Sequence, residues 1–239
     1  MTERRIGIAG WSIPPQYKDR FPEHGSHLER YAQCFDSVEI NSSFYRPHRR
    51  ATYERWADSV PEGFRFAVKM PRSITHEARF VGCHEALAKF LDEIHGLGSR
   101  QGPILVQLPP SFRFSEEVAD MFFAMLRENE NGLVVCEPRH ASWFGAEAEG
   151  VLIQHRIARV AADPAPVPEA AFPGGWPGLI YQRLHGVPEM YYSSYDAARL
   201  SALAKEIRQE ITPNWCIFDN TARGEASANA LDLLDDLKG

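Results

Sequence analysis

Short apolar runs that end in polar or charged residues recur along this chain of 239 residues. A buried strand of a parallel sheet is typically a nearly unbroken apolar run, because helices cover its faces. Eight such runs lie at residues 5–9, 37–41, 65–69, 104–108, 133–137, 158–162, 179–185 and 215–219. Parallel strands end on the same side of a sheet or barrel, so we expect the polar endings to meet at one rim.

Segments with apolar residues at helical spacing separate most of these runs. They cover residues 27–35, 51–60, 83–98, 115–129, 196–211 and 225–238. Ser115 and Asp196 are expected N-caps, and Gly96 and Gly98 indicate a helix C-terminus. A strand followed by a helix, repeated about eight times in a chain of this length, predicts an α/β fold of the TIM (β/α)8 barrel type. We expect it to form one domain over residues 1–239.

The pattern is weakest between residues 164 and 177, which hold five prolines and two glycines. Such a composition does not favour a helix. We therefore expect an irregular connection after the sixth strand, and we favour a rigid connector over a mobile lid.

Composition narrows the class of protein. A hydrophobic content of 44% and a charged content of 24% are ordinary for a globular protein. The net charge of −6 gives no overall attraction to nucleic acid, although it leaves a local basic patch open. The four cysteines show no CxxC spacing and are interpreted as small core residues. No apolar stretch approaches the length of a membrane span, and the N-terminus lacks a signal-peptide pattern, so we expect a cytoplasmic protein.

Seven motifs occur in a fixed order: AGW, VEINSSFYR, FRFAVKMPRSITH, ILVQLPPSF, CEPRHASWF, YQRLHG and FDNTARGEASANAL. Together they closely resemble the YecE-like family (domain of unknown function 72) of bacterial and archaeal proteins, from Ile6 to about Leu234. The resemblance implies a TIM barrel and no particular reaction. Two segments depart from the family pattern: DPAPVPEAAF is poor in Thr and aromatic residues, and the last strand ends in FDN where an Asn-rich ending is common.

Residues two apart on a strand point to the same face. Three strand endings carry such pairs: Glu39 with Asn41, Glu137 with Arg139, and Arg183 with His185. A carboxylate inside a barrel needs a cationic or hydrogen-bonding partner, and we expect Lys69 to be the neighbour of Glu39. The pairs predict a polar lining that binds a small anionic or hydroxylated molecule. The structural alternative is a set of internal salt bridges that fills the barrel.

The predicted site comprises titratable residues with catalytic roles and polar or aromatic residues with binding roles. The candidate catalytic residues are Glu39, Glu137, His185 and Asp219. The candidate ligand-binding residues are Trp11, Asn41, Tyr45, Lys69, Arg72, Gln107, Arg139, Arg183 and Asn220. Two carboxylates could act as acid and base if their environments separate their pKa values. A Lys or Arg beside each would instead hold it ionised, as a base or an anchor.

The leading hypothesis is an enzyme or enzyme-like binder of a small phosphorylated or polyhydroxylated molecule. A second hypothesis is a metal-dependent nuclease-like barrel acting on DNA, with Arg46, Arg49, Arg50 and Arg72 on backbone phosphates. A third is a non-catalytic barrel that binds a partner through the surface at 191–195. Catalysis itself, the cofactor and the oligomeric state are left open.

Two further sites remain open from the residues alone. His76, His140, His185, Asp163 and the rim carboxylates could form a nitrogen and oxygen metal site, although no metal ligand is assigned. The helix start after Asn220, with Gly186, Gly224 and Arg223, could hold an anion.

Overall fold

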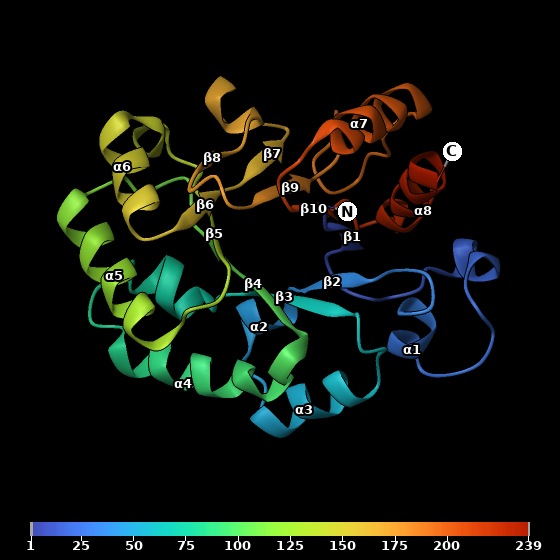
Figure 1. Cartoon of the computed structure of the whole chain (residues 1–239), viewed down its shortest axis with the longest axis horizontal. Coiled ribbons are helices and arrows are strands. Elements are labelled where there is room, and N and C mark those ends of the chain that lie inside the picture. Colours follow the sequence, from blue (N-terminus) through green and yellow to red (C-terminus); the bar gives the residue numbers. More distant parts are fainter. Residues whose placement is uncertain (1, 239) are drawn as a thin grey trace.

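The computed structural model describes residues 2–238 and is a TIM barrel with helices outside the strands (Figure 1). Within these residues eight parallel strands form the barrel, counting β6 and β7 as one strand, and neighbouring strands follow one another in chain order. The barrel strands are β1 (Arg4–Ile8), β2 (Ser37–Ile40), β3 (Arg65–Lys69), β4 (Gln101–Gln107), β5 (Val134–Glu137), β6 (Ile157–Arg159) with β7 (Ala161–Asp163), β9 (Ile180–Leu184) and β10 (Asn214–Phe218). The sixth predicted strand is thus divided in two.

Hydrogen bonds close the barrel at two seams between the sets β2-β3-β4-β5-β6 and β1-β10-β9-β7. At the first seam, the Gly10 N–H donates to the Glu39 carbonyl at 2.9 Å. At the second, β6 runs into β7 through Val160, whose N–H donates to the Cys136 carbonyl of β5 at 2.9 Å. Gly7 allows β1 to approach β2, because a Cβ there would lie 2.6 Å from the Ser37 carbonyl oxygen.

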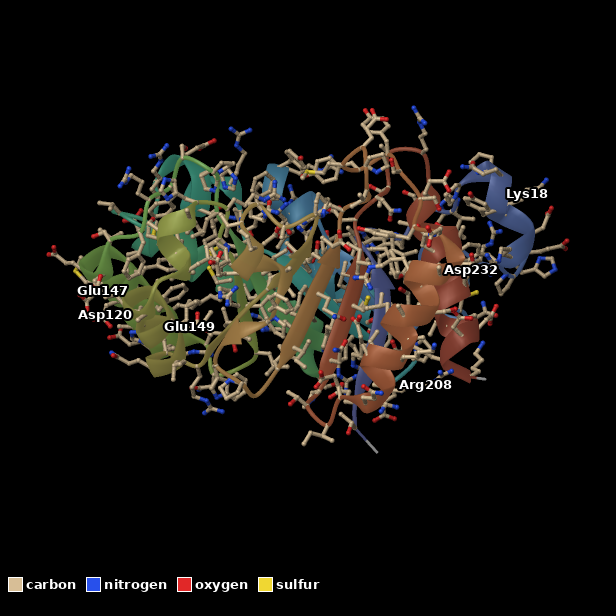
Figure 2. The ribbon with its side chains drawn as sticks, turned by 90° about the horizontal axis from the view of Figure 1, so that it is seen from above. Lys18, Asp120, Glu147, Glu149, Arg208 and Asp232 are labelled. Carbon is tan, nitrogen blue, oxygen red and sulfur yellow. The ribbon has the colours of Figure 1, made fainter. Side chains whose placement is uncertain are left out.

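The helices follow the predicted order. They are α1 (His27–Tyr31), α2 (Ser42–Tyr45), α3 (Arg50–Asp58), α4 (His84–Ile94), α5 (Glu116–Asn129), α6 (Ala146–Gln154), α7 (Ala197–Gln209) and α8 (Glu225–Lys238). Short helical turns are η1 (Pro15–Arg20), η2 (Ser73–Glu77), η3 (His95–Arg100), η4 (Ala141–Phe144) and η5 (Pro168–Ala171). Charged side chains such as Lys18, Asp120, Glu147 and Arg208 lie on this outer layer (Figure 2).

The two predicted N-caps have different outcomes. The Asp196 side chain accepts a hydrogen bond from the Arg199 N–H at 2.8 Å, so this cap of α7 is confirmed. Ser115 occupies the predicted N-cap position of α5, and its carbonyl accepts a hydrogen bond from the Ala119 N–H at 3.0 Å, but its side chain makes no cap hydrogen bond. Its backbone (φ −134°, ψ 121°) differs from that of Ser26 (φ −64°, ψ 165°), whose hydroxyl does cap α1.

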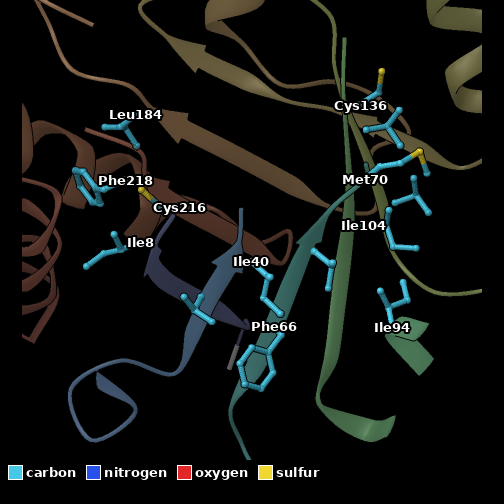
Figure 3. Close-up of a cluster of buried hydrophobic side chains, with 14 of the residues drawn as sticks. Ile8, Ile40, Phe66, Met70, Ile94, Ile104, Cys136, Leu184, Cys216 and Phe218 are labelled. Atoms are coloured by element: carbon cyan, nitrogen blue, oxygen red, sulfur yellow. The ribbon is translucent and has the colours of Figure 1, made fainter. Parts of the chain in front are cut away.

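Side chains on the strands alternate between two apolar clusters. The outer cluster lies between strands and helices and includes Ile8, Ile40, Phe66, Ile104, Cys136 and Phe218 (Figure 3). The smaller inner cluster includes Ala67, Leu105, Val135, Tyr181, Trp215 and Ile217. Apolar side chains therefore fill the barrel toward the beginnings of the strands, and the polar residues follow them at the C-terminal ends.

The connection between β7 and β9 contains no α-helix within the described residues. It holds η5 and β8 (Gly174–Gly175), which pairs antiparallel with β6. The predicted irregular connection after the sixth strand is therefore confirmed. No helix in residues 2–238 has the length and apolar character needed to cross a membrane.

Candidate functional site

Arg183 of β9 lies at the centre of a buried charge network, with none of its surface exposed. Its Nε and Nη2 donate to the two oxygens of Glu39 at 3.1 and 2.7 Å. Nη1 donates to Glu137 Oε2 at 2.7 Å, and Nη2 also donates to Asp219 Oδ2 at 3.0 Å. One guanidinium thus contacts carboxylates from the ends of three different strands.

Tyr181 is a member of this network that sequence reasoning missed. Its hydroxyl donates to Glu39 Oε2 at 2.8 Å, and the side chain is fully buried. The signal was available, because Tyr181, Arg183 and His185 share the same face of β9 at intervals of two residues. Glu39 therefore accepts three hydrogen bonds, which satisfy a carboxylate removed from water.

His185 bridges two carboxylates of the network. Its Nε2 lies 3.0 Å from Glu137 Oε1 and its Nδ1 lies 3.0 Å from Asp219 Oδ2. Burial lowers the pKa of His185, but the charge of Glu137 and the hydrogen bonds to Asp219 and Glu137 outweigh it, so the pKa is raised. Only the imidazolium form can donate to both carboxylates at once.

The same contacts keep the carboxylates ionised. Burial raises the pKa of Glu137, but the charges of Arg183 and His185 prevail and hold this pKa well below its usual value. The pKa of Asp219 is also lowered: burial opposes the shift, while the charge of Arg183 and the hydrogen bond from His185 cause it. Glu137 and Asp219 are thus acceptors, and His185 is the charged donor between them.

Gln107 and Arg139 also donate hydrogen bonds to Glu137. The Gln107 amide donates to Oε2 at 2.8 Å, and Arg139 Nη2 donates to Oε1 at 3.2 Å. Arg139 also reaches the Tyr191 hydroxyl at 3.4 Å, and its side chain keeps 20% of its surface exposed. Because its contact with Glu137 is single and long, Arg139 borders the network without being enclosed by it.

Lys69 is not the partner of Glu39, so that expectation was wrong. Its Nζ lies over the ring of Phe44 at 4.3 Å from the centroid, and no carboxylate of the described residues lies within 4.0 Å of it. The planar fork of Arg183 matches both oxygens of Glu39, whereas an ammonium is a point charge. Burial, followed by the charge of Arg183, lowers the pKa of Lys69 to about 8.

A cavity of about 210 Å³ adjoins the network. Glu137, Arg139 and His185 provide its polar part. The apolar part comes from Pro110, Ala162, Pro164, Ala165, Pro166 and Met190. Drug-sized ligands occupy pockets of roughly 300 Å³ or more, so this volume suits a smaller molecule. Sequence reasoning missed the role of the proline-rich connector, which contributes three of these residues.

Some predicted binding residues lie outside the network. Trp11 packs edge-on against Trp56 at 4.9 Å, next to the outer apolar cluster. Tyr45 is 74% exposed. Arg72 is half exposed and pairs with Glu77 at 3.0 Å. Asn41 does join the network, because its amide donates to Asp219 Oδ1 at 3.3 Å.

The segment after β10 is held by internal hydrogen bonds. Asn220 is fully buried and donates to the Ser193 carbonyl at 2.9 Å and to Asn229 at 2.8 Å. The N–H groups of Gly224 and Ala226 donate to backbone carbonyls at 3.0 and 3.1 Å. These donors are therefore already occupied at the helix start that could hold an anion.

Two of the candidate metal ligands, His140 and Asp163, have partners outside the charge network. His140 contacts Ser142 at 2.9 Å and Asp163 pairs with Arg199 at 3.3 Å. Among residues 2–238, no group of three or more His, Cys, Asp or Glu side chains is arranged to hold a metal ion. Arg183 takes the position between the carboxylates.

Comparison with known proteins identifies related chains. The family model described as "Protein of unknown function DUF72" matches residues 5–239. The UPF0759 protein YecE of Escherichia coli (strain K12) is 31% identical over 167 residues, which cover 68% of this chain and 60% of that protein. The match therefore spans less than two thirds of the length of that relative.

Solved structures share the fold. A DUF72 family protein of Thermotoga maritima has a TM-score of 0.80 and 26% identity, covering 99% of this chain and 100% of its own. A D-psicose 3-epimerase of Clostridium cellulolyticum, determined with D-tagatose, has a TM-score of 0.58 and 10% identity, over 100% and 98% of the chains. A 3-keto-L-gulonate-6-phosphate decarboxylase of Vibrio cholerae has a TM-score of 0.55 and 11% identity, over 99% and 98%.

Proposed function

The chain belongs to the DUF72 family, and we propose that it binds a small phosphorylated or polyhydroxylated molecule at its C-terminal rim and acts on it as an enzyme or enzyme-like binder. One observation carries the proposal. The 210 Å³ cavity borders directly on three members of the network, Glu137, Arg139 and His185.

The chemistry of this cavity suits a sugar-like molecule. Glu137 accepts hydrogen bonds from hydroxyl groups, and the partly exposed Arg139 donates to hydroxyl or phosphate oxygens. Pro110, Pro164 and Met190 offer apolar surface to the C–H groups of the same ligand. A ligand with hydroxyl groups on a carbon skeleton uses both kinds of surface.

The protonation states provide a route for acid and base chemistry. Glu137 is held ionised, so it can accept a proton from a ligand hydroxyl or carbon acid. His185 is held protonated and can donate one. Buried ion networks are weak stabilisers compared with apolar packing, which favours a ligand-directed role over a purely structural one.

The solved sugar enzymes guide the choice of test compounds. The epimerase and the decarboxylase share the barrel alone, at 10% and 11% identity, so the argument rests on the rim residues. Their printed names suggest ketoses and sugar phosphates as the first classes to screen.

Binding is measured by titration calorimetry with ketoses, aldoses, their phosphates, glycerol 3-phosphate and inorganic phosphate. Arg139→Met should weaken the binding of the best ligand by about tenfold or more, because a charge-assisted hydrogen bond contributes roughly 1.5–3 kcal/mol. The matched control is Arg55→Met, which removes an exposed arginine of α3. Turnover of any compound that is bound should fall in Glu137→Gln. The proposal fails if no compound binds, or if Arg139→Met and Arg55→Met bind equally well.

A further inference from the structure

We propose that Lys69 captures carbonyl compounds: its amine forms an imine with the aldehyde or ketone carbon of an open-chain sugar or sugar phosphate at the rim. This inference rests on the proposed function, because it assigns a chemical class to the same ligand. Lys69 is the one buried lysine among residues 2–238. The exposed lysines are Lys18, Lys89, Lys205 and Lys238.

The surroundings of Lys69 leave its nitrogen without a partner. Nζ makes no hydrogen bond and no ion pair with the described residues, although three carboxylates lie at the same rim. Arg183 binds all three at distances between 2.7 and 3.1 Å. Lys69 as a whole is 7% exposed. Its Nζ has no hydrogen-bond partner, but this atom is not completely buried. Nζ therefore keeps a small part of its surface open at the rim.

The charge state of this amine suits nucleophilic attack. A pKa of about 8 leaves roughly a tenth of the Lys69 amine neutral at pH 7, against well under a thousandth at the ordinary value of 10.5. Burial is the main cause, and the charge of Arg183 adds to it, whereas Glu39, Asp219 and Glu137 act in the opposite direction. The same three carboxylates favour the cationic iminium once it forms.

His76 packs against the same aromatic ring as this amine and is the base that we assign to the step. Its ring packs edge-on against Phe44 at 4.9 Å, and the same Phe44 ring lies under Lys69 Nζ. Its Nδ1 contacts the Thr75 hydroxyl at 2.8 Å. Burial, with the charges of Lys69 and Arg72, lowers the pKa of His76 to about 4, so the imidazole is neutral at pH 7. A neutral imidazole can accept a proton and return it.

The reaction is balanced without a further reagent. The Nζ lone pair forms the C–N bond, while one N–H proton passes to the carbonyl oxygen, with His76 as the carrier. The resulting hydroxyl takes the second N–H proton, again carried by His76, and leaves as water as the C=N bond forms. The imine nitrogen then takes up a proton from solvent to give the iminium. In the test, cyanoborohydride supplies a hydride that reduces the C=N bond to a stable secondary amine.

The test incubates the full chain with dihydroxyacetone phosphate and sodium cyanoborohydride at pH 7, followed by peptide mass mapping. Lys69 should carry at least about tenfold more adduct than any exposed lysine, because more of its amine is neutral. The four exposed lysines are controls within the same molecule, so the wild type alone decides the question. Adduct spread evenly over the lysines, or absent from Lys69, overturns the inference.

Two variants separate imine chemistry from simple binding. Lys69→Arg keeps the positive charge but cannot form an imine, so it should lose the adduct. Binding without imine formation is measured on the wild type with glycerol 3-phosphate, which has no carbonyl group. Lys89→Arg should keep the adduct on Lys69. If glycerol 3-phosphate binds but Lys69 is unlabelled, the imine inference fails and the proposed function stands. If Lys69 is labelled but no sugar or phosphate binds, the proposed function fails and the reactive amine stands.

Discussion

Replacing Arg183 by Met should leave three buried carboxylates without their shared guanidinium. Arg183 is fully buried and makes ion pairs with Glu39, Glu137 and Asp219 at 2.7, 2.7 and 3.0 Å. Removing one partner of a buried ion pair typically costs about 3–5 kcal/mol. At about 2–4 °C per kcal/mol for a chain of this size, we expect the melting temperature to fall by roughly 10 °C.

The loss should depend on pH in a defined direction. In the wild type, the lowered pKa values of Glu137 and Asp219 stabilise the fold above the unfolded pKa of about 4, and this stability is lost as the pH falls through the folded values. Without Arg183 these folded pKa values rise, because burial is no longer opposed by the same charge. The stability difference between wild type and variant should therefore grow from pH 4 to pH 7.

Urea unfolding of both proteins at several pH values measures this difference. Arg159→Met is the matched control, because Arg159 is also buried but pairs with one partly exposed carboxylate, Glu149, at 3.2 Å. Its loss should be smaller and nearly independent of pH. A stability difference for Arg183→Met that stays constant from pH 4 to pH 7 would refute the electrostatic reasoning.

Three further perturbations test separate parts of the structure. Arg139→Lys should change the free energy of unfolding by less than about 1 kcal/mol and should weaken ligand binding. Thermal melts with and without ligand measure both effects. A large loss of stability in the ligand-free protein would make Arg139 a structural residue. The raised pKa of His185 stabilises the fold below the unfolded pKa of about 6.5, and this stability is lost as the pH rises through the folded pKa. In urea unfolding, His185→Asn should therefore show a weaker fall of the free energy of unfolding with rising pH than the wild type. An equal fall in both proteins would contradict this account. Gly7→Ala should lower the free energy of unfolding by roughly 1–3 kcal/mol in the same assay, because its Cβ would lie 2.6 Å from the Ser37 carbonyl oxygen. The control is Gly63→Ala, whose Cβ would meet nothing within 4 Å. Equal effects of the two substitutions would refute this account.

The sequence determined the fold and the location of the charged rim. Apolar runs separated by helical segments indicated the barrel, and their polar endings placed Glu39, Glu137, Arg183, His185 and Asp219 at one side. These conclusions follow from local rules, since strand residues two apart share a face and parallel strands end together. The same spacing on β9 would also have indicated Tyr181.

The tertiary structure decided which charges meet. Lys69 and Arg183 both lie at the rim, but only Arg183 binds Glu39 across the barrel, and Lys69 is left over the Phe44 ring. The cavity wall at Pro164 and Pro166 comes from a connector that has no periodic pattern. Distances across a barrel depend on strand stagger and on the packing of the inner side chains. A sequence pattern fixes the face and the end of each strand, whereas partner choice depends on these distances between residues far apart in the chain.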